Sequence, residues 1–105
     1  MYRFMRILVL FDLPVVTLDE RRDYAKFRRF LIKEGFLMLQ ESVYSKICLN
    51  GSQTETCKRR LRKNKPPKGL VQILTVTERQ YANMEFLVGE NHHDVLNNDQ
   101  RIVIL

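Results

Sequence analysis

Apolar residues run almost unbroken from Met5 to Phe11, in the order MRILVLF. The run is too short for a typical helix and is rich in β-forming side chains, so it predicts a strand buried on both faces and central in a sheet. Asp12 follows it, and Leu13 and Pro14 then stop the strand because proline disfavours further pairing. We therefore expect a carboxylate at the carboxyl end of this strand.

A helix is predicted next. Thr17 and Glu20 have the spacing of a capping box, which marks a helix start, and Gly35 is placed to end the helix in a left-handed conformation. Three apolar side chains recur at helical spacing and are expected to face a core: Tyr24, Phe27 and Leu31. On another face of the same helix, basic residues are spaced by four, three and four: Arg22, Lys26, Arg29 and Lys33.

The segment 36–49, FLMLQESVYSKICL, favours β structure but is interrupted at 40–42. The interruption is compatible with a bend in one long strand or with a break between two strands. Asn50-Gly51 is a turn signal, and Ser52 with Glu55 repeats the capping-box spacing ahead of a second, short helix. We expect prolines 66 and 67 to end that helix, whose only obvious apolar pair is Cys57 and Leu61.

The remaining third of the chain predicts more β structure. The run LVQILTV after Gly69 reads as a strand, and Thr77 with Gln80 predicts a brief helical turn that contains Tyr81 and Met84. We expect an edge strand at 86–88, a polar loop at 90–100 and a last apolar strand, RIVIL, at 101–105.

These elements predict an α+β fold. If the segment 36–49 is two strands, the order is βαββαβ, the ferredoxin-like plan, with an additional C-terminal strand. The 105 residues suit one domain, 1–105, in which 90–105 form a loop and strand extension. Helices on one face would leave the other face of the sheet bare, so we expect a homodimer in which one apolar patch complements itself.

Composition narrows the class of partner. The chain is 45% hydrophobic, which is enough for a core, and its net charge of +6 favours a polyanion. No run approaches the roughly 20 apolar residues of a membrane helix, and Arg3 and Arg6 interrupt the N-terminal run, so we expect a cytoplasmic protein without membrane partners. Cys48 and Cys57 lack the spacing of a zinc site and are expected to be reduced.

Four segments form a recognisable series that extends from residue 5 to residue 105: MRILVLFD at 5–12, KFRRFLIKEGF at 26–36, QESVYSK at 40–46 and RIVIL at 101–105. Together, and in this order, they resemble the CRISPR-associated Cas-two family. Two further segments, DLP after the first strand and KGLVQILTVTE, look most like members from type II CRISPR systems.

The resemblance implies a role in spacer acquisition, the step of antiviral defence that adds new sequence to the CRISPR array. It implies a ferredoxin-like homodimer that scaffolds the integrase Cas-one and holds duplex protospacer DNA, while the integrase performs strand transfer. It also implies that the last strand contacts the integrase by strand addition: Arg101, Ile102, Val103, Ile104 and Leu105.

Asp12 is the candidate catalytic and metal-binding residue. Some family members are described as metal-dependent nucleases for RNA or DNA, with the matching aspartate near the dimer axis. One carboxylate is a poor Mg²⁺ site, but two copies of Asp12 facing each other would favour a cation between them, and the ion could activate a water for attack on a phosphodiester. The alternative is that Asp12 only ends the strand and hydrogen-bonds the turn before Pro14.

Two basic clusters are candidate DNA-binding surfaces that could neutralise phosphates without reading bases. The first is the helical stripe of Arg22, Lys26, Arg29 and Lys33. The second comprises Lys58, Arg59, Arg60, Arg62, Lys63, Lys65 and Lys68. A solvated charged face is the alternative for either cluster. We interpret His92-His93-Asp94 as surface loop, and Tyr24, Phe27 and Phe30 as core residues before base-stacking ones.

Three other functions remain open. An RNA-recognition module shares the βαββαβ order and the basic charge, but Lys68-Gly69-Leu70-Val71 lacks the aromatic residues that such a module places on a central strand. The second is a stand-alone magnesium-dependent endonuclease, for which Asp12 would be essential and the integrase would play no part. A regulatory dimer would need a small-ligand pocket, for which the sequence holds no motif.

Overall fold

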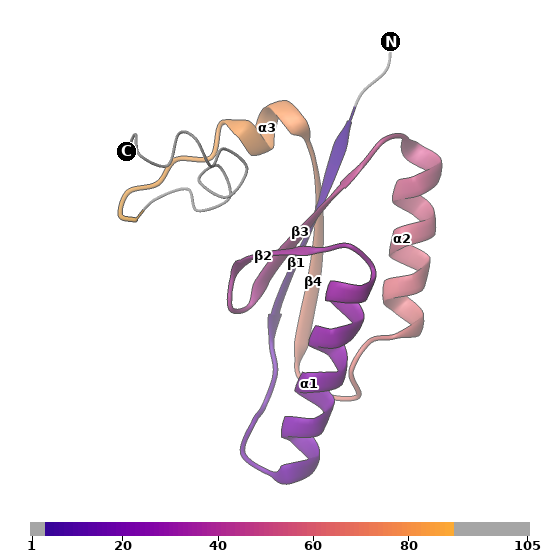
Figure 1. Cartoon of the computed structure of the whole chain (residues 1–105), viewed down its shortest axis with the longest axis vertical. Coiled ribbons are helices and arrows are strands. Elements are labelled where there is room, and N and C mark those ends of the chain that lie inside the picture. Colours follow the sequence, from indigo (N-terminus) through magenta and orange to yellow (C-terminus); the bar gives the residue numbers. More distant parts are fainter. Residues whose placement is uncertain (1–3, 90–105) are drawn as a thin grey trace.

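The computed structural model describes residues 4–89. Its elements, in chain order, are β1 (Met5–Asp12), α1 (Leu18–Lys33), β2 (Leu37–Gln40), β3 (Val43–Cys48), α2 (Gly51–Lys63), β4 (Leu70–Thr77) and α3 (Glu78–Ala82) (Figure 1). The interrupted segment 36–49 is therefore two strands. The predicted α+β class and βαββαβ order are confirmed, while the expected strand at 101–105 lies outside the described residues.

The four strands form one sheet in the order β2-β3-β1-β4, with every neighbouring pair antiparallel. β1 is central, as its apolar run predicts, and Ile7 pairs with Lys46 on one side and with Thr75 on the other. The register between β2 and β3 shifts at Met38/Gln40, which is where the interruption falls. The sheet edges are β4 and the short strand β2.

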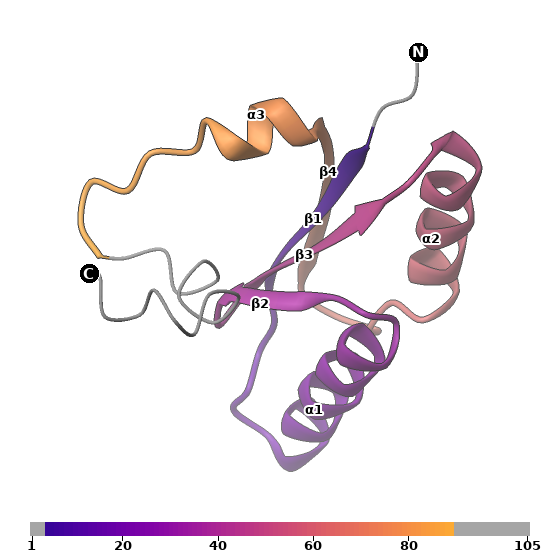
Figure 2. The ribbon, with the colours of Figure 1, turned by 45° about the horizontal axis from the view of Figure 1, so that its top comes forward.

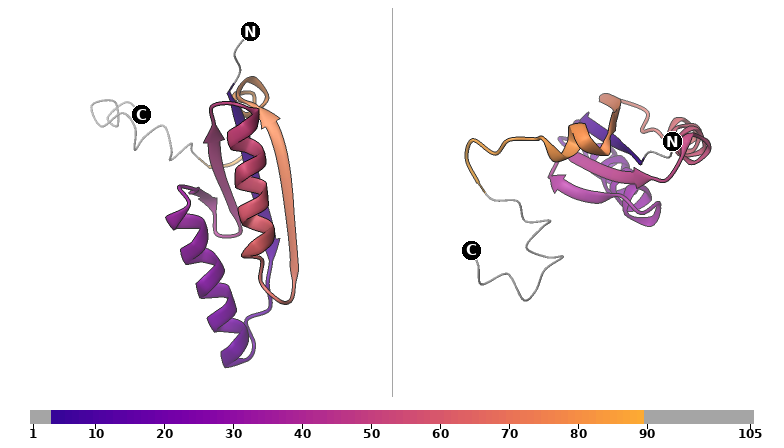
Figure 3. Two further views of the ribbon diagram at one scale, coloured as in Figure 1. Left: turned by 90° about the vertical axis from the view of Figure 1, so that its right-hand side faces the viewer. Right: turned by 90° about the horizontal axis from the view of Figure 1, so that it is seen from above.

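Both long helices cover the same face of the sheet (Figure 3). Ile7, Val9 and Phe11 alternate along β1 toward that face and are almost fully buried. The Phe11 ring packs edge-on against Phe27 of α1, with centroids 5.3 Å apart, and stacks on Tyr44 of β3. The core is completed by side chains from both helices and β3: Leu31, Cys48, Cys57 and Leu61.

The second face of the sheet, called the open face from here on, carries Leu8 and Leu10 of β1, with Ile47 and Leu74 beside them. Leu8 and Leu10 are half-buried, and Leu74 is 52% exposed. The prediction that β1 is buried on both faces is thus correct for one face only. The physical reason is that no helix layer of the described chain covers the other face.

The helix ends follow their capping side chains. Thr17 accepts a hydrogen bond from the Glu20 amide while the Glu20 carboxylate accepts from the Thr17 amide, so the predicted capping box of α1 is confirmed. Gly35, at φ +98°, follows α1 in the expected left-handed conformation. The same box between Thr77 and Gln80 begins α3, which ends at Ala82, before Met84.

The predicted cap of α2 is wrong. The helix begins at Gly51, and its N-cap is Asn50, whose side chain accepts a hydrogen bond from the Gln53 amide. Gln53 in turn accepts from the Leu49 amide. Asn50 is as good a cap as serine, and it lies two residues earlier, so Ser52 is already inside the first turn. The helix ends at Lys63, ahead of the prolines, as expected.

The predicted edge strand at 86–88 is also wrong. No strand is assigned between α3 and residue 89, and Leu87 and Val88 are more than 90% exposed. The segment leads away from the sheet after α3 (Figure 2), so it has no ladder in which to pair. No helix among residues 4–89 has the length and apolar character needed to cross a membrane.

Candidate nucleic-acid interface

The outer surface of α1 carries the predicted basic stripe. Phe27 and Leu31 are buried against the sheet, and the residues of the stripe lie on the opposite side of the helix because they are out of phase with this pair. All four are exposed: Arg22, Lys26, Arg29 and Lys33. The stripe therefore faces away from the core.

The second helix is arranged in the same way. Thr54, Cys57 and Leu61 form its buried side, and the opposite side presents exposed cations: Arg59, Arg62 and Lys63. Because α1 and α2 cover the same face of the sheet, the structure gathers both predicted basic clusters in one layer, called the helix layer from here on (Figure 3).

Ion pairs divide the candidate DNA-binding residues into two groups. Four of them have a carboxylate partner: Arg22 with Asp19, Lys58 with Glu55, Arg60 with Glu34, and Lys68 with Glu20. The others have no ion pair within the described part of the chain: Lys26, Arg29, Lys33, Arg59, Arg62, Lys63 and Lys65. This second group has its charge available for an outside anion.

The pair between Glu34 and Arg60 links the two helices. Arg60 Nε lies 2.7 Å from Glu34 Oε1, and a second guanidinium nitrogen contacts Oε2, which is the bidentate geometry of a strong charge-assisted pair. The guanidinium lowers the pKa of the Glu34 carboxyl below its ordinary value, and the carboxylate raises the pKa of Arg60. The sequence pattern placed Arg60 among the free cations and did not reveal this partner, which lies 26 residues away.

Asp12 lies at the carboxyl end of β1 and is exposed. It is in phase with Leu8 and Leu10, so it belongs to the open face, opposite the helix layer. No group of three or more metal-ligating side chains exists among residues 4–89. A magnesium site at Asp12 is therefore incomplete within one described chain and would need ligands from elsewhere.

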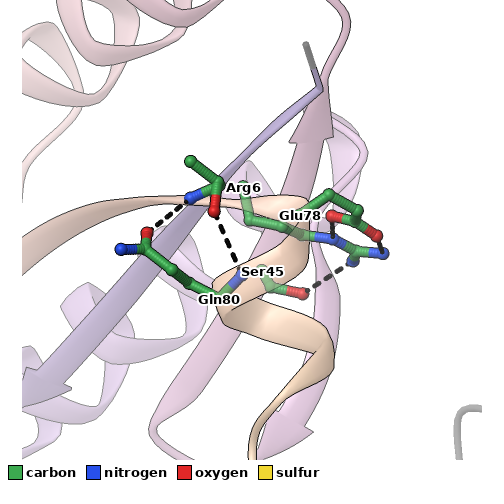
Figure 4. Close-up of polar contacts among 5 residues, drawn as sticks. Arg6, Ser45, Glu78 and Gln80 are labelled. Carbon is green, nitrogen blue, oxygen red and sulfur yellow. Dashed lines mark hydrogen bonds and ion pairs between the residues drawn. The ribbon is translucent and has the colours of Figure 1, made fainter.

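Arg6 forms the most connected polar cluster on the open face (Figure 4). Its Nε and one terminal nitrogen donate to the two oxygens of Glu78 at 2.7 and 2.9 Å, and its other terminal nitrogen lies 3.4 Å from the Ser45 hydroxyl. The guanidinium also sits 4.2 Å from the centre of the Tyr81 ring. These contacts fix α3 to the amino end of β1, and the one sequence signal for them is a charge inside an apolar strand.

The remaining candidates divide as follows. Phe27 is buried and Tyr24 and Phe30 pack against the core, so the interpretation of all three as core residues is confirmed. Within β1 and β3 the described members of the open face include no aromatic ring of the kind an RNA-recognition module uses: Arg6, Leu8, Leu10, Asp12, Val43, Ser45 and Ile47. The nearest aromatic residue in sequence is Phe4, just before β1, which is 41% exposed. The candidates at 92–94 and 101–105 lie outside the described residues.

The chain matches known proteins over most of its length. The family model described as CRISPR associated protein Cas2 matches residues 5–84. A protein of Treponema denticola, named CRISPR-associated endoribonuclease Cas2, is 52% identical over 96% of this chain and 100% of its own length. A protein of the same name from Streptococcus mutans serotype c (strain UA159) is 48% identical over 96% of this chain and 93% of its own.

A solved structure supports the fold. The protein described as "Crystal structure of cas2" superimposes with a TM-score of 0.57 over 84% of this chain and 90% of its own, at 19% sequence identity. At that identity the likeness concerns the fold alone.

Proposed function

Because the chain belongs to the CRISPR-associated Cas2 family, we propose that it acts in spacer acquisition as a dimeric scaffold that binds duplex DNA. The observation that carries this proposal is the separation of two surfaces. The helix layer presents the unpaired cations, and the open face, on the other side of the sheet, presents apolar side chains.

Each surface suits one part of that function. Exposed lysine and arginine side chains without carboxylate partners can neutralise phosphates and make no demand on base sequence, which a machine that stores arbitrary sequences requires. The open face offers large apolar side chains with 39–56% exposure at Leu37, Ile47, Leu70 and Leu74. A second copy is the simplest cover for such a patch, because a two-fold axis makes it complement itself.

The experiment is a salt titration of duplex binding. Arg29→Gln and Arg62→Gln should each reduce the slope of log association constant against log salt by about 0.9, the value for one lost phosphate contact. Arg79→Gln is the matched control, since it removes one exposed charge from α3, which Arg6 holds at the open face through Glu78 and Tyr81. A wild-type protein with no affinity for duplex DNA would refute the proposal, as would equal slopes for all three variants.

The remaining parts of the function also rest on the family. We propose that the integrase Cas-one is the partner, that it is contacted through 101–105, that the complex works in the cytoplasm, and that it belongs to a type II system. Co-purification of the full chain with the integrase, and its loss when 101–105 are removed, is the direct test.

A second candidate function is metal-dependent endoribonuclease activity. The names of the curated relatives favour an endoribonuclease. Metal dependence is favoured by the position of Asp12 on the open face, because a two-fold axis through that face could bring two copies of Asp12 together. Mg²⁺ bound there would polarise a water or phosphate oxygen. Asp12→Asn should abolish cleavage of RNA while leaving duplex binding unchanged, and undiminished cleavage would remove Asp12 from the role.

A further inference from the structure

A groove lined by both polar and apolar atoms lies in the helix layer, between the end of α1 and α2. Its volume is about 220 Å³, and β3 contributes Lys46 and Cys48 to it. The other lining residues are Glu34 after α1, and Ser52, Gln53, Thr56, Cys57 and Arg60 along one side of α2. None of the candidate DNA-binding residues except Arg60 belongs to this groove.

The charges in the groove do not cancel. Lys46 and Arg60 contribute two cations, and Glu34 contributes the one carboxylate. Both oxygens of Glu34 already accept from Arg60, and Lys46 makes no ion pair in the described structure, although its charge helps to lower the pKa of Glu34. The ammonium of Lys46 lies beside Gly35, within 3.9 Å of where a Cβ of that residue would stand, which places it where α1 ends.

The groove also offers neutral donors. Gln53 uses its side-chain oxygen to accept from the Leu49 amide, which leaves its NH₂ group to donate. The hydroxyls of Ser52 and Thr56 lie one turn apart on the same side of α2. The thiol of Cys57 is held protonated because burial raises its pKa to about 11, so it adds no negative charge at neutral pH. An excess cation surrounded by hydroxyl and amide donors is a site for an oxyanion.

We propose that this groove binds one phosphate of the duplex DNA backbone, with Lys46 as the charged ligand and Ser52 and Thr56 as hydrogen-bond donors. This inference rests on the proposed function, because the groove lies in the helix layer, whose exposed cations are the candidate ligands for DNA. Glu34 then limits affinity, since its carboxylate repels the phosphate and occupies Arg60.

The proposal makes two predictions of opposite sign. Lys46→Gln should weaken duplex binding roughly fivefold at low salt and reduce the salt slope by about 0.9, whereas Lys46→Arg should restore both. Glu34→Gln should strengthen binding roughly fivefold, because it removes the negative charge and releases Arg60. Inorganic phosphate serves as a competitor. It should displace duplex DNA from the wild-type protein more readily than from the Lys46→Gln protein.

Glu55→Gln is the matched control. Glu55 pairs with Lys58 on α2 but does not line the groove. Glu55→Gln therefore removes one carboxylate and frees one cation, as Glu34→Gln does, but outside the groove. The groove is refuted if Glu55→Gln and Glu34→Gln strengthen binding equally, or if Lys46→Gln binds like Arg79→Gln. If the Glu34→Gln protein does not fold, the comparison of Lys46→Gln with Lys46→Arg tests the phosphate site by itself. Absence of duplex binding by the wild type refutes the proposed function as well, and stronger binding of RNA than of duplex DNA refutes the assignment to a DNA phosphate.

Discussion

At the scale of single residues, Gly69 shows how closely the backbone packs behind Asp12. Gly69 adopts φ +93°, and a Cβ added to it would lie 2.8 Å from the Asp12 carbonyl oxygen and 2.8 Å from a methyl group of Leu13. Any other residue type would therefore be strained in its backbone and would also push against the carboxyl end of β1.

We predict that Gly69→Ala lowers the free energy of unfolding by roughly 2–4 kcal/mol, because it combines a left-handed backbone with a steric clash. Gly89 is the control, since its φ is +98° but no atom of residues 4–89, apart from its own chain neighbour, lies within 4 Å of an added Cβ. Gly89→Ala should cost only the backbone strain, about 1 kcal/mol. Urea unfolding measures both, and equal losses would show that the contact with Asp12 has no weight.

The pKa of Glu34 gives a pH-dependent prediction. Arg60 lowers this pKa in the folded state below the ordinary 4.5, so the unfolded chain binds the proton more readily. The stability that the pair contributes is therefore present above pH 4.5 and lost as the pH falls through the folded pKa. The difference in unfolding free energy between wild type and Glu34→Gln should shrink toward zero in acid, as followed by urea titrations at several pH values. Glu41→Gln is the control, because it removes one exposed carboxylate that has no ion pair in the described structure.

At the scale of elements, the start of α2 separates two expectations. We predict that Asn50→Ala lowers the free energy of unfolding by about 1 kcal/mol, because the Gln53 amide loses its partner. Ser52→Ala should be nearly neutral, since Ser52 is exposed inside the first turn and is not the cap. Thermal or urea unfolding of the two variants measures the contrast, and a larger loss at Ser52 would contradict the assignment of the cap.

The elements were largely predictable from the sequence because they depend on local patterns. The apolar run of β1 and the boxes at Thr17 and Thr77 act over a few residues and needed no tertiary information. The strand predicted at 86–88 failed because an apolar triplet cannot show whether a neighbouring strand exists to pair with it. The partners of Arg6 and Arg60 lie 72 and 26 residues away, and the groove around Lys46 joins three elements, so no local pattern could reveal them.

At the scale of the whole molecule, the open face should determine the oligomeric state. We predict that Leu74→Asp converts the proposed dimer to a folded monomer, because Leu74 is 52% exposed on that face and a carboxylate buried at the interface would be unpaired. Val16→Asp is the control, at an 81% exposed position before α1, and should leave the dimer intact. Sedimentation velocity measures the mass, and a monomeric wild type would contradict the assignment of this face.

The opposite placement of the helix layer and the open face has a consequence for how tightly the protein holds DNA. If two copies join by their open faces, each contributes its own cations to a shared ligand, so binding becomes bivalent and the second attachment occurs at high effective concentration. Dilution below the point where the copies separate would then release the nucleic acid sharply rather than gradually. The amount of protein in the cell would thereby set a threshold for occupancy.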